Sequence, residues 1–380
     1  MSLADLTRNA VDVLPEGELE AKLGLGRPLR VKLGIDPTGP DIHIGFAVVL
    51  RRLRAFQDAG HTAVLIVGDY TARIGDPSGR SKERQVLPDD VLDRNAKLFA
   101  EQAYRILDRA RTEIRFNGEW LGKLDYAELV RLTRTGTVAQ LLERNDFRER
   151  FSSSAPISVS ELLYPFAQGY DSVAVEADIE VGGTDQLYNL LMGRDVMAHY
   201  GLVPQSVITY ELLVGTDGVE KMAKSVGNYV GIDEDPEEQF GKVMSIPDTA
   251  IDQWWRLALD AEPPPLEPMA AKLALAKGIV DLYHGTEEAE RAGDHFTRVV
   301  REGQAPDDVP NAVLPAGDPV HLPGVLAHVF GLSTSEARRL IAQGGVKVDG
   351  EVVGELDVPR SRLRGKVIQA GKRRFARLSD

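Results

Sequence analysis

Two short stretches of the 380-residue sequence carry side chains suited to phosphate chemistry. The first is the turn 36–46, Asp-Pro-Thr-Gly-Pro-Asp-Ile-His-Ile-Gly-Phe. If a strand ends just before it and a helix begins near His43, the unpaired N–H groups and positive dipole end of that helix form a phosphate site. Thr38 and His43 would add donors, and Gly45 would let a flat base lie against the backbone. Taken alone, the turn also fits an ordinary helix start.

The second stretch is Lys221-Met-Ala-Lys224-Ser, which follows the loop 215–218, Gly-Thr-Asp-Gly. Two cations three residues apart on a loop suit a leaving pyrophosphate, whose negative charge grows in the transition state. A solvated lysine-rich loop is the alternative interpretation. Both stretches occurring in one chain, in this order, favours the phosphate interpretation.

The elements that would position these residues follow from hydrophobic patterning. Short apolar runs at 29–33 and 63–67 predict buried parallel strands, and helical spacing predicts a helix over 44–59 between them. Further strands are expected at 112–116, 179–181 and 207–213, with helices at 137–151 and through most of 236–295. The pattern predicts an α/β fold with a Rossmann-like, doubly wound parallel sheet. The sequence contains neither G-x-G-x-x-G nor G-x-x-x-x-G-K-[ST], so these two nucleotide-binding motifs are excluded.

Length and charge predict a multidomain protein with a basic end. A chain of 380 residues is expected to form two or three domains. The net charge of −13 argues against a protein that coats nucleic acid along its whole surface. However, residues 336–380 hold eleven basic and six acidic residues, which suggests a polyanion bound at that end. A solvated basic surface is the alternative.

Composition also bears on the cellular compartment and on possible membrane or metal association. There is no cysteine, no apolar run long enough for a membrane span, and no signal-peptide pattern at the N-terminus. We therefore expect a cytoplasmic protein without a membrane partner. The seven histidines show no metal-ligand spacing, so no structural metal is expected.

The two phosphate-binding stretches resemble the HIGH and KMSKS motifs of class I aminoacyl-tRNA synthetases. Three further stretches are similar to the tyrosyl-tRNA synthetase family: Tyr164-x-x-x-Gln168-x-x-Asp171, Gly182-Gly-Thr-Asp-Gln186, and the turn Ile74-Gly-Asp-Pro-Ser-Gly-Arg80 with its following basic residues. The segment 333–350 resembles an S4 RNA-binding domain. The resemblance covers about residues 29–380.

This resemblance implies a set of site residues. Catalytic roles fall to Thr38, His43, Gln186, Lys221 and Lys224. ATP binding falls to Asp36, Gly45, Gly183, Asp185 and Lys224. Tyrosine binding falls to Lys32, Asp76, Tyr164, Gln168, Asp171 and Gln186. RNA binding by the basic tail is expected from Arg338, Arg339, Lys347, Lys372, Arg373 and Arg374.

The resemblance also implies an ATP-dependent ligase. The expected reaction joins tyrosine to the terminal adenosine of its tRNA through a tyrosyl-adenylate, with Mg²⁺ accompanying ATP and no permanently bound cofactor. A homodimer is expected, with 137–151 near the interface. The first implied domain is a catalytic domain at 1–220, with an insertion at about 118–165. An α-helical domain at 221–310 would begin with the loop that carries Lys221 and Lys224. A small α+β S4-like domain is implied at 320–380.

Three positions depart from the family pattern. Phe46 replaces the second His of the first motif, and Ala223 replaces the first Ser of the second. Lys32 stands where many members have a Tyr that contacts the substrate phenol. We expect its ammonium to donate to that phenol instead, and a substrate with a different side chain is the alternative. The departures leave two alternatives open: a paralogue that binds RNA without charging it, and a ligase that adenylates an amino acid for another acceptor.

Overall fold

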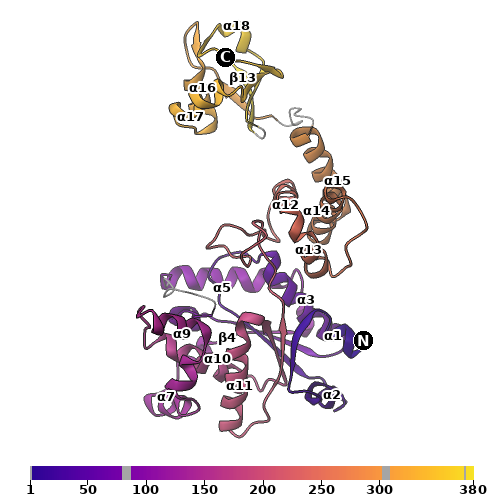
Figure 1. Cartoon of the computed structure of the whole chain (residues 1–380), viewed down its shortest axis with the longest axis vertical. Helices are drawn as coiled ribbons and strands as arrows, with labels where there is room; N and C mark the ends of the chain where they lie inside the picture. The colour runs from indigo at the N-terminus through magenta and orange to yellow at the C-terminus, as the bar shows by residue number, and fades with distance from the viewer. Residues whose placement is uncertain (1, 79–86, 302–308, 372–373) are drawn as a thin grey trace. The chain divides into compact units, whose positions relative to one another are not determined.

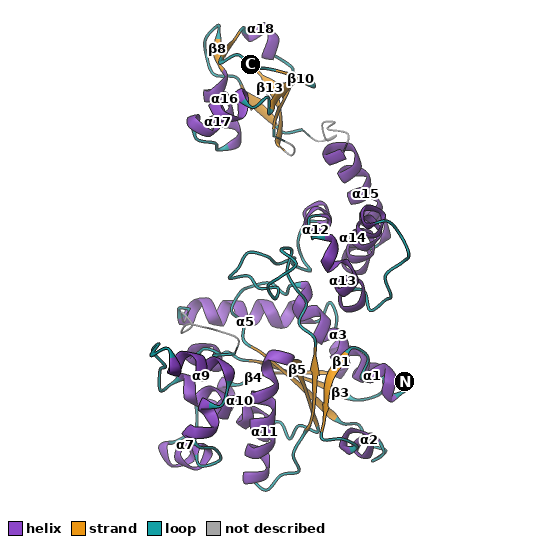
Figure 2. Ribbon diagram, viewed as in Figure 1, coloured by secondary structure: helices purple, strands orange, loops and turns teal. Residues whose placement is uncertain are grey.

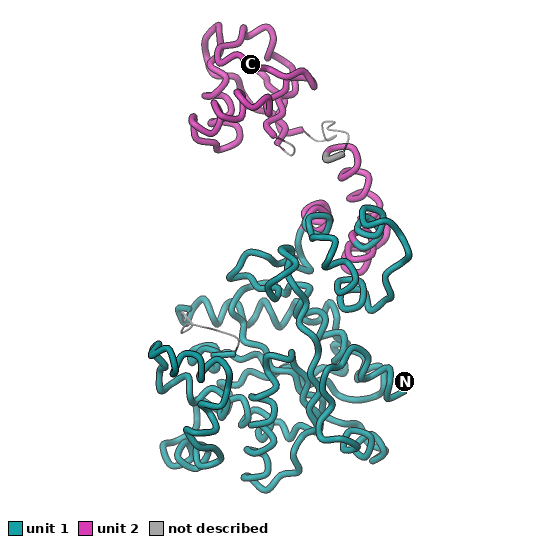
Figure 3. The backbone as a smooth tube through the Cα atoms, in the orientation of Figure 1, with its two compact units in different colours: residues 1–234, 242–275 teal, residues 235–241, 276–380 magenta. Residues whose placement is uncertain are grey.

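The computed structural model describes residues 2–78, 87–301, 309–371 and 374–380. The described chain divides into two compact units, residues 1–234 with 242–275, and residues 235–241 with 276–380 (Figure 3). The predicted division at 220 and 310–320, with its insertion, stays a prediction. None of the described helices has the length and apolar character needed to cross a membrane.

The first unit is built on a six-stranded sheet with the order β1-β6-β5-β2-β3-β4 (Figure 2). Its strands are β1 (Ala10–Leu14), β2 (Arg30–Ile35), β3 (Thr62–Val67), β4 (Thr112–Phe116), β5 (Ile179–Gly183) and β6 (Ser206–Tyr210). β2 to β6 pair in parallel, whereas β1 pairs with β6 antiparallel. The predicted α/β class and doubly wound sheet are confirmed, and each predicted strand is present with bounds shifted by up to three residues. The edge strand β1 was not predicted.

Helices cover this sheet and connect its strands (Figure 1). Those of the first unit are α1 (Leu3–Leu6), α2 (Glu18–Leu23), α3 (Ile44–Asp58), α4 (Thr71–Ile74), α5 (Asp89–Ala103), α6 (Gly118–Leu121), α7 (Tyr126–Thr133), α8 (Val138–Leu142), α9 (Asn145–Ser152), α10 (Tyr164–Ala174), α11 (Leu187–His199) and α13 (Ile251–Ala258). α3 packs on β2 and β3, α11 packs on β5 and β6, and α10 packs against α11.

The crossovers from the two central strands leave in opposite directions. The chain passes from β2 through α3 to β3 on one side, and from β5 through α11 to β6 on the other. Because both crossovers of a doubly wound sheet are right-handed, they occupy opposite faces and leave a crevice between β2 and β5. Ligands of open α/β sheets bind in that crevice, at the carboxyl ends of the strands.

The helix predicted at 137–151 is interrupted, which corrects that prediction. α8 ends at Leu142, and Arg144 has an extended ψ of 136° before α9 begins. The Arg144 side chain is buried and paired with Asp146, so its burial accompanies the break in the helix.

The second unit contains the basic tail. α12 (Pro236–Met244) and α14 (Pro268–His284) each have residues assigned to both units, and α15 (Thr286–His295) belongs to the second. The tail forms a five-stranded sheet of order β10-β9-β12-β13-β7, with α16 (Leu322–Phe330) packed against α17 (Thr334–Ala342). Its strands are β7 (Asn311–Val313), β9 (Val346–Val348), β10 (Glu351–Val352), β12 (Val367–Ala370) and β13 (Arg374–Ser379), beside the pair β8 (Val320–His321) and β11 (Asp357–Val358) and the short α18 (Arg360–Leu363). Ser333 caps α17 in a reciprocal capping box with Glu336.

Candidate active site

The first phosphate-binding turn lies where the crevice was expected. It follows the carboxyl end of β2, and His43 is the N-cap of α3. The imidazole is buried, its Nδ1 accepts the Phe46 N–H at 3.4 Å, and this contact leaves Nε2 as the nitrogen that carries hydrogen. Burial lowers the pKa of His43 to about 3, with smaller contributions from the positive charges of Lys224 and Lys221. His43 is therefore a neutral donor near physiological pH.

Phe46 lacks the hydrogen-bond donor of the usual second His, but its ring packs against the imidazole of His43. The two rings stack with centroids 4.2 Å apart and planes inclined by 21°. Phe99 on α5 packs against Phe46 in a T-shaped arrangement, with centroids 5.9 Å apart. The aromatic substitution in the motif thus restricts the imidazole from one side.

The loop that carries Lys221 and Lys224, here called the lysine loop, packs against the N-terminus of α3. Lys221 pairs with Asp185 at 2.7 Å, and Lys224 pairs with Asp41 at 3.3 Å. Between them, Sδ of Met222 accepts the Gly45 N–H at 3.3 Å. Burial lowers the pKa of Lys224, and the charge of Asp41 opposes that shift. The predicted phosphate-binding residues from the two stretches are therefore brought together.

Gly45 and Gly183 lie at close approaches. A Cβ on Gly45 would lie 3.1 Å from the His43 ring, and one on Gly183 would lie 2.6 Å from Leu212 and 2.8 Å from the Asp185 carboxylate. Any larger residue at Gly183 would displace the side chain of Leu212 or of Asp185, and Asp185 lies in the turn Thr184–Gln186 that follows β5.

The second half of the site is carried by α10. Tyr164, Gln168 and Asp171 are buried and spaced four and three residues apart, so they share one helical face. The Tyr164 hydroxyl donates to Oδ2 of Asp36 at 3.0 Å, and Oδ1 of Asp36 accepts from Thr71 at 2.7 Å. The Asp36 carboxylate thus joins the phosphate-binding turn to the helix expected to hold the amino acid.

Asp171 is a buried carboxylate with two protein donors. Nε1 of Trp120 donates to Oδ1 at 2.8 Å, and Nδ2 of Asn117 donates to Oδ2 at 3.2 Å. Burial raises the pKa of Asp171 to about 7, whereas Lys32 and the two donors lower it and Glu180 raises it further. A carboxylate has about four lone-pair positions, so two donors leave capacity for a substrate hydroxyl.

Lys32 lies beneath this helix with all three of its N–H groups donating to protein atoms. Its ammonium contacts Glu180 at 2.8 Å, Ser172 Oγ at 2.8 Å and the Gln168 carbonyl at 3.0 Å. These contacts favour positioning of α10 over donation to a ligand, and the phenol contact of Lys32 stays a prediction.

Asp76 and Gln186 meet at the remaining side of the crevice. Nε2 of Gln186 donates to Oδ2 of Asp76 at 2.9 Å, and the Ser78 N–H donates to Oδ1 at 2.9 Å. Thr38 lies at the turn after β2, half-buried, with its N–H donating to the Asp36 carbonyl at 2.8 Å. Arg80, whose stretch supported the family resemblance, lies outside the described residues.

Several site residues were not identified from the sequence. Asn117 could have been found, because it is a polar residue directly after the carboxyl end of β4. Trp120, Asp41 and Arg144 carry no comparable local signal, since their contacts depend on tertiary packing. Within the described ranges, no group of three His, Asp or Glu side chains has the arrangement of a metal site.

The basic tail places four of its six predicted RNA-binding residues on described elements. Arg338 and Arg339 are exposed on α17, Arg374 is exposed at the start of β13, and Lys347 is half-buried on β9. Lys372 and Arg373 lie outside the described residues. The Ser333 N–H and hydroxyl lower the pKa of Glu336, and Arg339 and Arg374 also lower it, so these two cations share one acidic neighbour.

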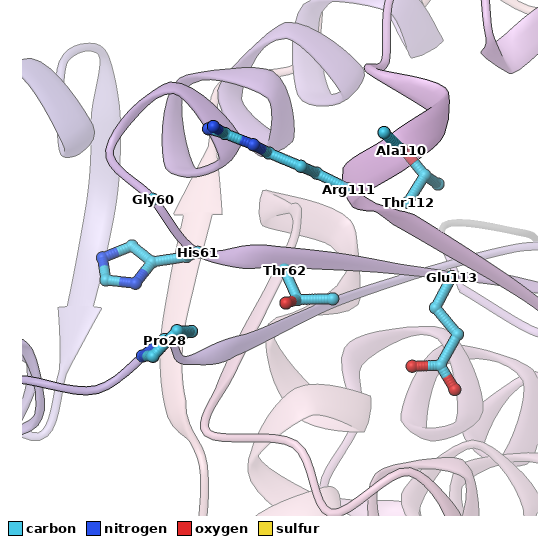
Figure 4. A pocket seen from close by; sticks show the side chains of 8 residues that line it. All are labelled: Pro28, Gly60, His61, Thr62, Ala110, Arg111, Thr112 and Glu113. Atoms are coloured by element: carbon cyan, nitrogen blue, oxygen red, sulfur yellow. The ribbon is translucent and has the colours of Figure 1, made fainter.

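A pocket of about 390 Å³ opens at the amino ends of strands β2, β3 and β4 (Figure 4). Its lining residues include Pro28, His61 and Arg111, which precede or begin the strands β2, β3 and β4. Because the crevice lies at the carboxyl ends of the strands, this pocket is separate from the site described above.

Comparison with known families gives two matches. Residues 25–300 match the family described as tRNA synthetases class I (W and Y), and residues 323–357 match the S4 domain. The predicted S4-like tail is thereby confirmed.

Curated relatives match along nearly the whole chain. A tyrosine–tRNA ligase of Thermotoga maritima is 46% identical over 387 residues, covering 98% of this chain and 96% of the relative. One from Geobacter sulfurreducens is 46% identical over 402 residues, covering 100% of both chains.

Solved structures share the fold. A tyrosyl-tRNA synthetase from Archaeoglobus fulgidus, complexed with L-tyrosine, has a TM-score of 0.62 at 22% identity, covering 77% of this chain and 98% of that one. A C-terminally truncated mitochondrial tyrosyl-tRNA synthetase from Aspergillus nidulans has a TM-score of 0.61 at 20% identity, covering 77% and 91%. Together with the near full-length relatives, these matches confirm the family predicted from the motifs: the chain belongs to the tyrosyl-tRNA synthetase family of class I tRNA synthetases.

Proposed function

We propose that this protein is a tyrosine–tRNA ligase, which activates L-tyrosine with ATP and then transfers the tyrosyl group to its tRNA. The observation that carries the proposal is the arrangement at the sheet crevice. The buried carboxylate of Asp171 lies on α10. The neutral His43 caps the N-terminus of α3, and Lys221 and Lys224 lie near it on their loop. Such a crevice suits a phenol at one end and a triphosphate at the other.

In the first step the tyrosine carboxylate attacks the α-phosphorus of ATP and pyrophosphate leaves. This step needs no protein nucleophile, so the enzyme acts by positioning and charge stabilisation. We assign the phosphates to Thr38, Nε2–H of His43, Lys221 and Lys224. The nucleoside would lie on Gly45 and Gly183, with Asp185 near the ribose. Mg²⁺ would accompany ATP, held mostly by its phosphates.

ATP entry would require the lysine loop to exchange partners. Lys221 and Lys224 are paired with Asp185 and Asp41, and Met222 contacts the Gly45 amide that would face the base. Phosphate oxygens would replace these carboxylates as partners of the lysines. Because the Asp36 carboxylate accepts a hydrogen bond from Tyr164, it would hold the phosphate-binding turn in a fixed position relative to the tyrosine-binding helix α10.

Tyrosine would be held by its ammonium, its carboxylate and its phenol. We assign the ammonium to Asp76, Tyr164 and Gln168, the carboxylate to Gln186, and the phenol to Asp171. In this assignment Lys32 keeps Asp171 and its helix in place through Glu180, Ser172 and the Gln168 carbonyl.

The second substrate would be the tRNA for tyrosine. The exposed cations Arg338 and Arg339 of the S4 domain, and Arg374 further along the basic tail, suit phosphate contacts. We also propose a homodimer with residues 137–151 near its interface. Two apolar side chains of that segment are exposed, Val138 by 61% and Phe151 by 67%.

One experiment separates this function from its two alternatives. Purified protein is assayed for tyrosine-dependent exchange of pyrophosphate into ATP with Mg²⁺, and for attachment of tyrosine to tRNA. We expect both activities. Exchange without attachment would favour a ligase with another acceptor. Absence of exchange with all twenty amino acids, alongside tRNA binding, would favour an RNA-binding paralogue.

A further inference from the structure

A buried chain of hydrogen bonds runs from the break between α8 and α9 to the predicted carboxylate site. It begins at Arg144, whose side chain is 4% exposed. Nε and Nη2 of Arg144 contact the two oxygens of Asp146 at 3.1 and 2.8 Å. Nη1 donates to Oδ1 of Asn189 at 2.7 Å, and Nη2 also donates to Oγ of Ser78 at 3.1 Å.

The chain continues from Asn189 to Gln186. Nδ2 of Asn189 donates to Oε1 of Gln186 at 3.0 Å and to Oγ of Ser78 at 3.2 Å. Nε2 of Gln186 then donates to Asp76 at 2.9 Å. Asn189 and Ser78 are 1% and 3% exposed, so water does not compete for these contacts.

The direction of every bond in this chain follows from its first member. A guanidinium carries donors and no acceptor, so the atom of Asn189 that faces Arg144 must be its oxygen. The Asn189 amino group is thereby turned toward Gln186, and the oxygen of Gln186 must face it. The Gln186 amino group then points to Asp76, with its second N–H available for a ligand.

We propose that Arg144 is a positioning residue that sets the amide orientation of Gln186 through Asn189, so that an N–H group and not an oxygen faces the substrate carboxylate. The proposal rests on the assignment of that carboxylate to Gln186. If the Gln186 amide were reversed, Oε1 would face two carboxylates, that of Asp76 and that of the substrate. Both contacts would become repulsive.

The surroundings of Arg144 favour this role over a purely local one. Its guanidinium carbon lies 5.1 Å from the ring centre of Phe147 and 5.0 Å from that of Tyr188. The aromatic rings and the Asp146 carboxylate restrict the guanidinium while Nη1 reaches Asn189.

The test compares binding of tyrosine with binding of tyramine, which keeps the phenol and ammonium but lacks the carboxylate. Dissociation constants are measured by calorimetry for the full-length protein. Arg144→Met should weaken tyrosine binding by roughly 10- to 100-fold, the loss expected for one hydrogen bond to a charged group. Tyramine binding should change by less than about threefold. Arg144→Lys, which keeps a cationic donor, should recover part of the preference for tyrosine.

Asn189→Asp provides a second, sharper variant. Aspartate still accepts from Arg144, but it has no N–H for Gln186 and attracts the Gln186 amino group instead. The preference for tyrosine should therefore fall at least as far as in Arg144→Met, although Arg144 keeps a partner.

The matched control is Arg150→Met. Arg150 is another buried arginine, within α9, and it pairs with Glu161 at 2.7 and 2.8 Å. Losing it leaves a buried carboxylate without that partner and should lower the stability of the protein. The ratio of tyrosine to tyramine affinity should stay as in the unmodified protein.

The proposed relay is the orientation of Gln186 by Arg144 through Asn189, and it rests on the assignment of the substrate carboxylate to Gln186. A double-mutant cycle tests the relay and the assignment separately. Gln186→Ala should itself reduce the preference for tyrosine, and Arg144→Met should add no further loss of preference in that background. If Gln186→Ala leaves the preference unchanged, the carboxylate assignment is wrong. If Gln186→Ala reduces it but Arg144→Met and Asn189→Asp weaken both ligands equally, as Arg150→Met would through general loosening, the proposed relay is overturned.

Discussion

Trp120 donates its indole N–H to Oδ1 of Asp171 at 2.8 Å, and this bond joins the segment after β4 to helix α10. The Asp171 carboxylate is 2% exposed, and its pKa is raised to about 7 chiefly by burial. Trp120, Asn117 and Lys32 act in the opposite direction, by stabilising the charged form. The acceptor proposed for the substrate phenol therefore changes its protonation within the working pH range.

The pH dependence of tyrosine binding should follow this equilibrium. Affinity should rise as pH increases through about 7, because the ionised carboxylate accepts more strongly than the acid. Trp120→Phe keeps an aromatic ring but removes the donor. A hydrogen bond to a charged group contributes about 1.5–3 kcal/mol, so the midpoint should move upward by about one to two pH units. Calorimetric titration with tyrosine between pH 5.5 and 9 measures it, and an unchanged midpoint would contradict the assigned role of Trp120.

Asp171 should also make the free energy of unfolding depend on pH. Its pKa is about 7 in the folded protein, against about 3.9 for an unfolded Asp. Between these values the folded state holds the proton more often, so this group makes stability fall as pH rises and the loss is complete above about 7. Asp171→Asn removes that contribution. In urea unfolding, Asp171→Asn should therefore gain stability relative to the unmodified protein from pH 5 to pH 8; a constant difference would argue against the raised pKa.

The stack of Phe46 on His43 should matter for catalysis through His43. His43→Ala should lower kcat of pyrophosphate exchange by about a hundredfold, as for other single preorganised donors. Phe46→Leu should lower it by up to about tenfold, since aromatic pairs contribute about 0.5–1.5 kcal/mol. In the His43→Ala background the Phe46→Leu effect should largely disappear. An undiminished effect there would mean that Phe46 acts independently of the imidazole.

The lysine loop should act on the chemical step. Lys221→Met is expected to lower kcat of exchange by roughly 10²- to 10³-fold, because its charge would stabilise the leaving pyrophosphate in the transition state. The KM for tyrosine should change little. Ala223→Ser, which restores the usual motif residue between the same two lysines, should stay within about twofold of the unmodified protein. Equal losses in both variants would indicate that loop structure, rather than lysine charge, limits the rate.

The sequence predicted the parts of the fold and site that are encoded locally. Apolar runs ending in turns predicted β2 and β3, and β4, β5 and β6 were expected as further strands. The residues directly after β2 and β5 lie at the carboxyl ends of these strands, which border the crevice. Helical spacing also placed Tyr164, Gln168 and Asp171 on one face correctly, since a period of three to four residues is a local property.

Features that depend on distant contacts escaped prediction. The break at Arg144 could not be read from 137–151, because the partners of its side chain include Asn189 and Ser78, 45 and 66 residues away. Strand β1 was missed because an antiparallel edge strand depends on the pairing partner β6. The contact of the Lys32 ammonium with Glu180, 148 residues away at 2.8 Å, was likewise not foreseen, whereas the expected contact of Lys32 with the substrate phenol stays a prediction.

The most direct test of the central claim compares tyrosine with phenylalanine in pyrophosphate exchange. If Asp171 accepts the phenolic hydroxyl in a buried pocket, phenylalanine leaves that contact unmade. The expected discrimination in kcat/KM is about 10⁵, a value already characteristic of tyrosyl-tRNA synthetases and not obtained from this geometry. Asp171→Ala should reduce that ratio by several orders of magnitude. Comparable exchange with both amino acids in the unmodified protein, or a ratio untouched by Asp171→Ala, would contradict the account.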